Sequence, residues 1–226
     1  MRVSTTRRLT DQGRERKQQL LDAAATLFAS RGYGPTRIAD ICEAAGVAKG
    51  LFYWYFETKE SLFAELVRSM RTQLRRSQGA AMDPDADPVT RIRQGAEASV
   101  RFMAEHMAFF ALLEMERTDE AILPVLREGS EVYVADTSRL VAEAQAAGLV
   151  PDDHDARLLA RGVHGAVSHF SHFHRSGRIE LSVDELAVFV GEWVVRALTA
   201  EIPAALPAPD GRLVSASPAA RRARMP

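Results

Sequence analysis

Hydrogen-bond donors gather between positions 36 and 59 of this chain. Tyr53 and Tyr55 carry hydroxyls, and Lys59 carries a full positive charge. Thr36 follows a proline where a short apolar pattern begins, so we expect it to cap a helix and to present its hydroxyl and backbone N–H outward. Groups of this kind bind oxyanions such as phosphate, and their contacts position a partner without reading its sequence.

Histidines form a second group of possible ligands, because four of them fall within eleven positions: His164, His169, His172 and His174. Zinc usually takes three or four ligands, and no cysteine or carboxylate joins these imidazoles at helical spacing. We therefore expect no metal site and no cofactor, and we interpret the histidines as interface or partly solvated side chains.

Motifs of common catalytic sites do not occur in the 226 residues. There is no Gly-rich phosphate loop, no HExxH pattern and no GxSxG pattern, so we expect that the chain is not an enzyme. The single cysteine, Cys42, excludes an intramolecular disulfide and fits a reducing cytoplasm. No uncharged apolar run approaches the ~20 residues that span a bilayer, and the charged N-terminus is unlike a signal peptide. We expect a cytoplasmic protein with no membrane partner.

Charge is divided unevenly along the chain. Residues 1–78 carry 14 Lys and Arg against 8 Asp and Glu, whereas residues 79–226 carry 15 against 22. A basic first third on an acidic remainder suggests that only the first part meets a polyanion, although surface charge can also scatter in this way by chance. The motifs must therefore decide between the two interpretations.

Helical patterns surround the donors. From Arg14 to about Gly32, apolar residues recur at the spacing of one helix face. Two short helices are predicted on either side of Gly46, and Thr58 can cap a longer helix that runs to about Ser77.

The segment 37–56 has the features of two short helices that cross at a steep angle. Cys42 supplies a small side chain at the crossing, and Gly46 supplies a residue that tolerates positive φ in the turn. The inner faces are apolar, through Ile38, Ile41, Ala45, Val47 and Phe52. These features, in register on the basic part of the chain, indicate a helix-turn-helix (HTH) motif.

The block AAGVAKGLFYWYF at 44–56 is followed closely by TKE, and FASRGY precedes it at 28–33. Through these motifs the segment from about Arg14 to Leu74 resembles the DNA-binding domain of the TetR family of bacterial regulators. It departs mildly from the family pattern at Cys42, where Ala is usual, and at Trp54, where His is frequent.

The resemblance implies which residues would face base edges: Arg37, Ala48, Lys49, Gly50 and Leu51. Lys49 could donate to guanine O6 or N7, while Ala48 or Leu51 could pack on a thymine methyl. Gly50 would let the helix backbone approach the groove closely.

The remaining expected DNA contacts go to phosphates, from Thr36, Tyr53, Trp54, Tyr55 and Lys59. For the two tyrosines a second interpretation stays open, in which their rings are core aromatics, as we expect for Phe52 and Phe56.

The stretch Ser77 to Pro88 contains glycine, prolines and aspartates and indicates a domain boundary. Further helices are predicted at about 89–115, 120–147, 154–176 and 182–201. We therefore predict an all-α fold of about nine helices. It comprises an N-terminal three-helix HTH domain at 14–76, a C-terminal helical ligand-binding and dimerisation domain at 89–201, and flexible tails at 1–13 and 202–226.

The helix at 154–176 has an apolar core face and a second, small-sided stripe: Leu158, Gly162, Gly165, His169 and His172. A helix with two such faces has two partners. Together with the apolar last helix it could form an intersubunit four-helix bundle in a homodimer, as the resemblance implies. A contact within one chain is the alternative.

The resemblance also implies a ligand pocket in the second domain. The candidate lining residues are Phe102, Met103, His106, Phe110 and Tyr133, with His106 or Tyr133 supplying a polar contact. Alternatively, His106, Tyr133 and Asp136 pair with one another in an ordinary core. The Phe and Met content favours an apolar or aromatic effector.

Together these features predict a sequence-specific regulator that binds palindromic double-stranded operator DNA as a homodimer. We expect a repressor that an apolar small molecule releases from its operator. A ligand-independent regulator and an activator would use the same DNA-binding domain, and both remain open.

Overall fold

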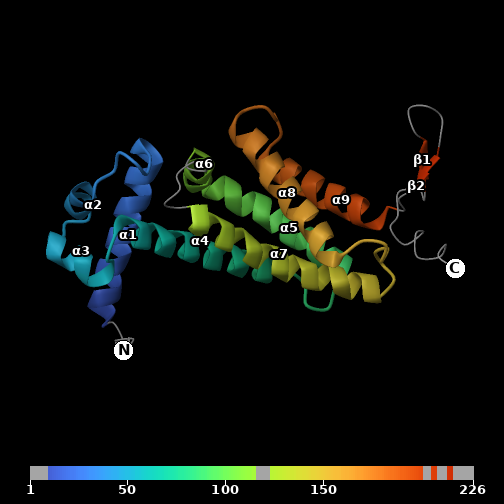
Figure 1. The fold of residues 1–226 in the computed structure, drawn as a ribbon, viewed down its shortest axis with the longest axis horizontal. Coiled ribbons are helices and arrows are strands. Elements are labelled where there is room, and N and C mark those ends of the chain that lie inside the picture. The colour runs from blue at the N-terminus through green and yellow to red at the C-terminus, as the bar shows by residue number, and fades with distance from the viewer. Residues whose placement is uncertain (1–9, 116–122, 201–204, 208–212, 216–226) are drawn as a thin grey trace. The chain divides into compact units, whose positions relative to one another are not determined.

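The structure, a computed structural model, describes residues 10–115, 123–200, 205–207 and 213–215. Its helices are α1 (Asp11–Arg31), α2 (Ile38–Ala44), α3 (Lys49–Tyr55), α4 (Lys59–Ala81), α5 (Pro88–Glu105), α6 (Met107–Met115), α7 (Leu123–Ala146), α8 (Ala156–Arg175) and α9 (Val183–Thr199) (Figure 1). The predicted all-α fold is confirmed, with nine helices in the described residues.

The chain divides into two compact units. The first comprises residues 1–75 and 105–130, and the second comprises residues 76–104 and 131–226. This division is less simple than the continuous ranges predicted from sequence, because residues 105–130 return to the first unit. The predicted single helix at 89–115 is interrupted at His106, where the chain passes between units, and the carbonyl of His106 accepts the first hydrogen bond of α6.

Aromatic rings form the centre of the first unit. Phe28, Tyr33 and Phe63 meet with ring centroids 5.2–5.8 Å apart, and both phenylalanines are fully buried. Phe109 and Leu112 from α6 join the same core. Helices α4 and α6 thus complete the core that the three N-terminal helices form. The outer faces of α2 and α3 lie outside this core.

Local signals explain the crossing of α2 and α3. Gly46 lies between them with φ 64°, a conformation that a side chain would strain, as the sequence predicts. Cys42 is 5% exposed at the crossing, and burial raises the pKa of its thiol. Phe52 is fully buried and fixes α3 against the core.

Helix α9 approaches α5 closely in the second unit. A Cβ at Gly191 would lie 2.8 Å from Cγ of Glu97 and 3.0 Å from Cγ of Arg93, so only glycine fits without a shift. Arg101 and Asp184 join the same two helices through a 2.8 Å hydrogen bond.

The ends of the chain differ from the prediction in two places. Helix α1 begins at Asp11, not Arg14, because the hydroxyl of Thr10 accepts the N–H of Gly13 at 3.2 Å and caps the helix. In the C-terminal tail, Ala205–Pro207 pairs antiparallel with Leu213–Ser215, where no strand was predicted. Residues 1–9, 201–204, 208–212 and 216–226 lie outside the described residues.

Candidate nucleic-acid interface

The first turn of α3 is an open surface. Ala48 is the N-cap, and Ala48, Lys49 and Gly50 are all exposed. A Cβ placed on Gly50 would meet nothing within 4 Å, so the protein itself does not require glycine there. Leu51 is half-buried. The first turn of this helix could therefore approach another surface at backbone distance.

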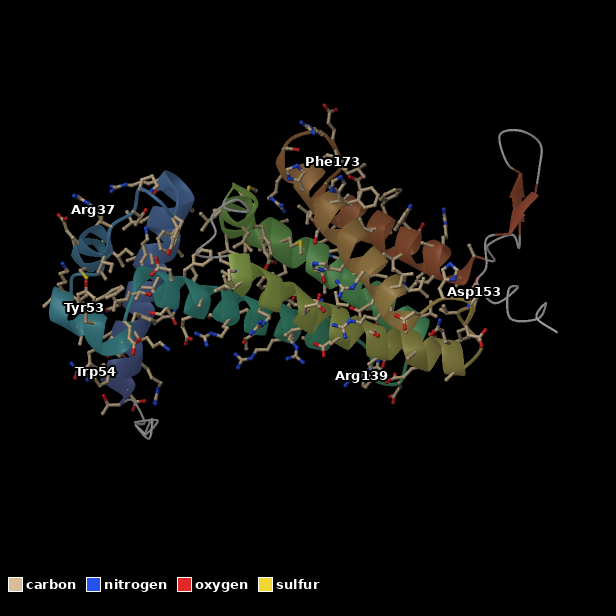
Figure 2. All side chains as sticks on the ribbon, in the orientation of Figure 1. Arg37, Tyr53, Trp54, Arg139, Asp153 and Phe173 are labelled. Carbon is tan, nitrogen blue, oxygen red and sulfur yellow. The ribbon has the colours of Figure 1, made fainter. Side chains whose placement is uncertain are left out.

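Two aromatic side chains lie exposed beyond this turn. Tyr53 is 50% exposed and Trp54 is 53% exposed, values that are high for large rings. Nζ of Lys49 lies 5.9 Å from the ring centroid of Tyr53. Figure 2 shows Arg37 just before α2, and Tyr53 and Trp54 on α3, at the same end of the first unit.

Arg37 is the residue that precedes α2, and its side chain is held by Asp40. The carboxylate accepts the backbone N–H of Arg37 at 3.0 Å and its guanidinium at 3.2 and 3.0 Å. These hydrogen bonds hold the pKa of Asp40 below its ordinary value, and the same pairing raises the pKa of Arg37. The guanidinium remains largely exposed, so its direction is fixed while its outer edge is open.

Thr36 does not have the predicted arrangement. The N-cap of α2 is Arg37, and Thr36 is 1% exposed. Its hydroxyl donates to the carbonyl of Gly32 at 2.7 Å and therefore points into the protein. The prediction of an outward capping hydroxyl is wrong, because the carbonyls at the end of α1 are the nearer acceptors.

Lys59 also has an unexpected role, although it begins α4 as predicted. Its ammonium donates to the carbonyls of Tyr33 at 2.7 Å, Thr36 at 3.0 Å and Gly34 at 3.2 Å. It also lies 4.2 Å from the ring centroid of Tyr33. An ammonium has three donors, so all three are engaged in holding the loop between α1 and α2.

Tyr55 is half-buried and joins two distant parts of the chain. Its hydroxyl donates to the carbonyl of Gly13 at 2.7 Å, across 42 residues of sequence. The ring meets Trp54 edge-on at 4.6 Å. The open alternative of a structural aromatic therefore describes Tyr55 in this structure better than an outward hydroxyl, whereas Tyr53 remains exposed.

The candidate ligand residues are divided between the two units. Phe102, Met103 and Tyr133 belong to the second unit, whereas His106 and Phe110 belong to the first. Phe102 and Met103 are buried on α5, and Tyr133 stacks on His164 with ring centroids 6.1 Å apart. This stacking was not foreseen, because the two rings lie on different helices.

A small cavity lies in the second unit, and none of the candidate ligand residues is among its lining residues. It measures about 10 Å³, room for roughly one water molecule. Its lining comprises Val100, Ala104, Ser171, His174, Arg175, Val183 and Leu186. The hydroxyl of Ser171 is buried here and has no hydrogen-bond partner in the described part of the protein. Sequence patterns gave no sign of this site.

An apolar surface covers the outer faces of α8 and α9. Its large exposed side chains are Leu158, Val188, Phe189 and Trp193, each 42–59% exposed. A Cβ at Gly162 or Gly165 would meet nothing within 4 Å. At these two glycines, the small-sided stripe predicted on α8 therefore meets no other described part of the chain. An exposed apolar face of this kind is typical of a protein contact.

The residues that the structure describes contain no group of three His, Cys, Asp or Glu side chains placed to hold a metal ion. Within the same residues, no helix is both long and apolar enough to cross a membrane.

Comparison with known proteins gives matches to both parts of the chain. A family model described as "Bacterial regulatory proteins, tetR family" matches residues 20–66. A second, described as "Tetracyclin repressor-like, C-terminal domain", matches residues 85–198.

Curated relatives match over shorter stretches. The regulator YhgD of Bacillus subtilis (strain 168) is 29% identical over 119 residues, 52% of this chain and 55% of that protein. The repressor KstR2 of Rhodococcus jostii (strain RHA1) is 46% identical over 59 residues, 26% of this chain and 29% of that protein. The matched part of the chain thus spans about half of the first relative and less of the second.

Solved structures share the fold over most of the chain. A TetR-like transcriptional regulator from Rhodococcus sp. RHA1 aligns with a TM-score of 0.65 and 24% identity, over 82% of this chain and 97% of that one. The fatty acid degradation regulator FadR from Bacillus halodurans aligns with a TM-score of 0.72 and 20% identity, over the same shares.

Proposed function

The chain belongs to the TetR family of bacterial regulatory proteins, and from that premise we propose that it is a sequence-specific transcriptional repressor that binds operator DNA. The observation that supports this most directly is the open first turn of α3, where Lys49 and Gly50 lie exposed beside Tyr53 while Phe52 anchors the helix. A helix of this kind, presented by a helix-turn-helix, enters the major groove with its first turn.

The proposed contacts divide into two groups. Arg37, Ala48, Lys49, Gly50 and Leu51 read base edges, and Tyr53 and Trp54 lie against the sugar–phosphate backbone. An indirect, positioning role is left for Thr36, Tyr55 and Lys59, because their polar groups donate hydrogen bonds within the protein.

Selection of bound sequences from a random duplex pool tests this function. We expect a palindrome whose half-sites lie about 34–36 Å apart, as two symmetry-related recognition helices require. Lys49→Ala should then lose about ten-fold or more in affinity for the selected site, since a specific base contact contributes about 1–3 kcal/mol. Arg139→Ala is the matched control, because Arg139 is an exposed cation of the second unit. Equal affinities of the two variants would contradict the assigned role of Lys49.

The partner in DNA binding is a second copy of the chain. The apolar faces of α8 and α9, with the open glycines of α8, have the composition of an intersubunit four-helix bundle. Burial of Phe189 and Trp193 from both subunits would remove these rings from water, where they are costly.

The effector is an apolar or aromatic small molecule bound by the second unit. Support comes from the buried apolar side chains of α5, such as Phe102 and Met103, together with the polar edge of Tyr133 in the same unit. Binding would release the operator only if the ligand prefers the conformation that does not bind DNA. A regulator that binds DNA regardless of ligand would show no release by any apolar compound.

A further inference from the structure

The guanidinium of Arg37 is held along one edge by the carboxylate of Asp40. Nε donates to Oδ2 at 3.2 Å, and Nη2 donates to Oδ1 at 3.0 Å. A guanidinium carries five N–H donors, and these two bonds engage only two of them. The other edge, formed by Nη1 and Nη2, keeps one parallel donor on each nitrogen. The Arg37 side chain is 79% exposed, so this edge is open to a partner, at the same end of the first unit as Tyr53 of α3 (Figure 2).

The backbone that carries this side chain is also fixed. Thr36, directly before Arg37, is 1% exposed, and its hydroxyl donates to the carbonyl of Gly32 at 2.7 Å. The carbonyl of Thr36 accepts a hydrogen bond from the ammonium of Lys59 at 3.0 Å. On the other side the chain enters α2, where Asp40 accepts the backbone N–H of Arg37 at 3.0 Å. Arg37 is therefore preorganised in both its backbone and its side chain.

The open edge of Arg37 has the geometry to bind either guanine or phosphate. Two parallel N–H donors match O6 and N7 of guanine in the major groove, and they also match two oxygens of a phosphate. The charge of the pair favours guanine. Asp40 neutralises Arg37, and its carboxylate would repel a phosphate that approached the guanidinium, whereas a neutral base edge meets no such repulsion.

We propose that Asp40 is a positioning residue, which holds the guanidinium of Arg37 so that it reads O6 and N7 of one guanine in each half-site. The inference rests on the proposed function, because only a bound operator supplies the guanine. An arginine without this carboxylate would lose its side-chain freedom on binding and could turn to a neighbouring phosphate. Asp40 thus contributes to sequence preference without contacting DNA itself.

Operators with a modified base test the contact between Arg37 and guanine. The selected operator is made with 7-deazaguanine in place of each guanine in turn, in both half-sites. This base pairs normally with cytosine but lacks the N7 acceptor. The unchanged protein should lose about ten-fold or more in affinity when the guanine read by Arg37 is replaced, the size of one specific base contact. Arg37→Ala should bind the normal and the modified operator equally at that position and still discriminate at the others.

Asp40→Asn tests the positioning role. The amide oxygen can still accept the backbone N–H of Arg37 and so preserve the start of α2, but the second acceptor for the guanidinium is gone. This variant should lose most of the discrimination against 7-deazaguanine at the position read by Arg37 and keep it at other guanines. Glu43→Gln is the matched control, because it removes the same charge from an exposed position of α2. It should discriminate like the unchanged protein.

Asp40→Glu is a second variant, and thermal melting of both variants checks the fold. Glutamate keeps the charge and a carboxylate that can cap the helix, but its extra methylene displaces the acceptors of the guanidinium. It should therefore also lose discrimination at the position read by Arg37.

Three contrary results have distinct meanings. Full discrimination in both folded Asp40 variants would overturn the positioning role. A loss by Arg37→Ala that is equal on every operator, with a salt slope lowered by about 0.9 for each subunit, would mean that Arg37 binds phosphate and would overturn the guanine contact. In both cases the operator is still selected, so the proposed function stands. Failure of the unchanged protein to select any duplex would instead overturn the proposed function, and this inference with it.

Discussion

At the scale of single residues, some polar side chains of the first unit point to solvent, and others donate hydrogen bonds within the protein. Lys49 and Tyr53 face outward, whereas Thr36, Tyr55 and Lys59 donate to carbonyls of the protein. A donor engaged with a carbonyl stabilises a loop and only indirectly affects a ligand. The two groups should therefore respond differently to substitution.

Lys59→Ala should destabilise the free protein by about 2 kcal/mol, because three charge-assisted hydrogen bonds to the α1–α2 loop are lost, two of which are partly buried. Denaturant unfolding measures this change. Lys49→Ala should leave the free energy of unfolding unchanged, since Lys49 is exposed. Native stability in Lys59→Ala, combined with a salt slope lowered by about one, would show that Lys59 binds phosphate instead.

The pair of Arg37 and Asp40 gives a prediction about acid titration. Hydrogen bonds from Arg37 depress the pKa of Asp40 in the folded protein. The stabilisation from this pair is thus present above the ordinary carboxyl pKa, near 3.9, and is lost as the pH falls through the lower folded value. Arg37→Gln should raise the pKa of Asp40 toward its ordinary value in an NMR titration. An unchanged titration curve would mean that the pair does not persist in solution.

At the scale of elements, the sequence was sufficient to predict those turns and helix boundaries that neighbouring residues determine. Gly46 and the apolar positions around it predict the turn and both short helices, and Thr58 correctly marks the start of α4. The roles of Tyr55 and Lys59 were not predictable, because their acceptors lie 23 to 42 residues away along the chain. The break at His106 has no local signal either, since the pattern on both sides is helical.

Substitution by leucine should have different effects at two glycines of the second unit: on dimer assembly at one and on subunit stability at the other. Gly165 is open, so Gly165→Leu should leave each subunit folded and weaken the dimer, by about 1–3 kcal/mol at each of two symmetric sites. Gly191 faces Glu97 and Arg93, so Gly191→Leu should instead lower the stability of the subunit itself. Sedimentation measures assembly, and thermal melting measures stability. A Gly165→Leu protein that remains a native dimer would remove α8 from the interface.

At the scale of the whole molecule, α4 and α7 each have residues in both units. We propose that α4 connects ligand binding with DNA binding, since it starts at Lys59, next to the loop that precedes α2. Typical coupling of this kind changes affinity about 5- to 150-fold.

The double variant Phe102→Ala, Tyr133→Ala, which changes two residues of the second unit, tests this connection. A compound that releases the operator from the unchanged protein should release it much less well from the variant, at equal DNA affinity, because an apolar wall and a polar contact are gone. Titration of the compound against the bound operator gives the measurement. Undiminished release would place the effector site elsewhere.

The buried thiol at the crossing of α2 and α3 is a natural probe of local unfolding in this region. Cys42 is the single cysteine of the chain, and burial both shields it and raises its pKa, so it should react slowly with alkylating reagents while α2 and α3 remain packed. Its modification can proceed only when that packing opens. The rate of labelling therefore measures how often the DNA-binding region unfolds locally in the unaltered protein. Bound operator should slow the labelling, and the slowing should increase with the stabilisation that the operator gives to the packing of α2 against α3.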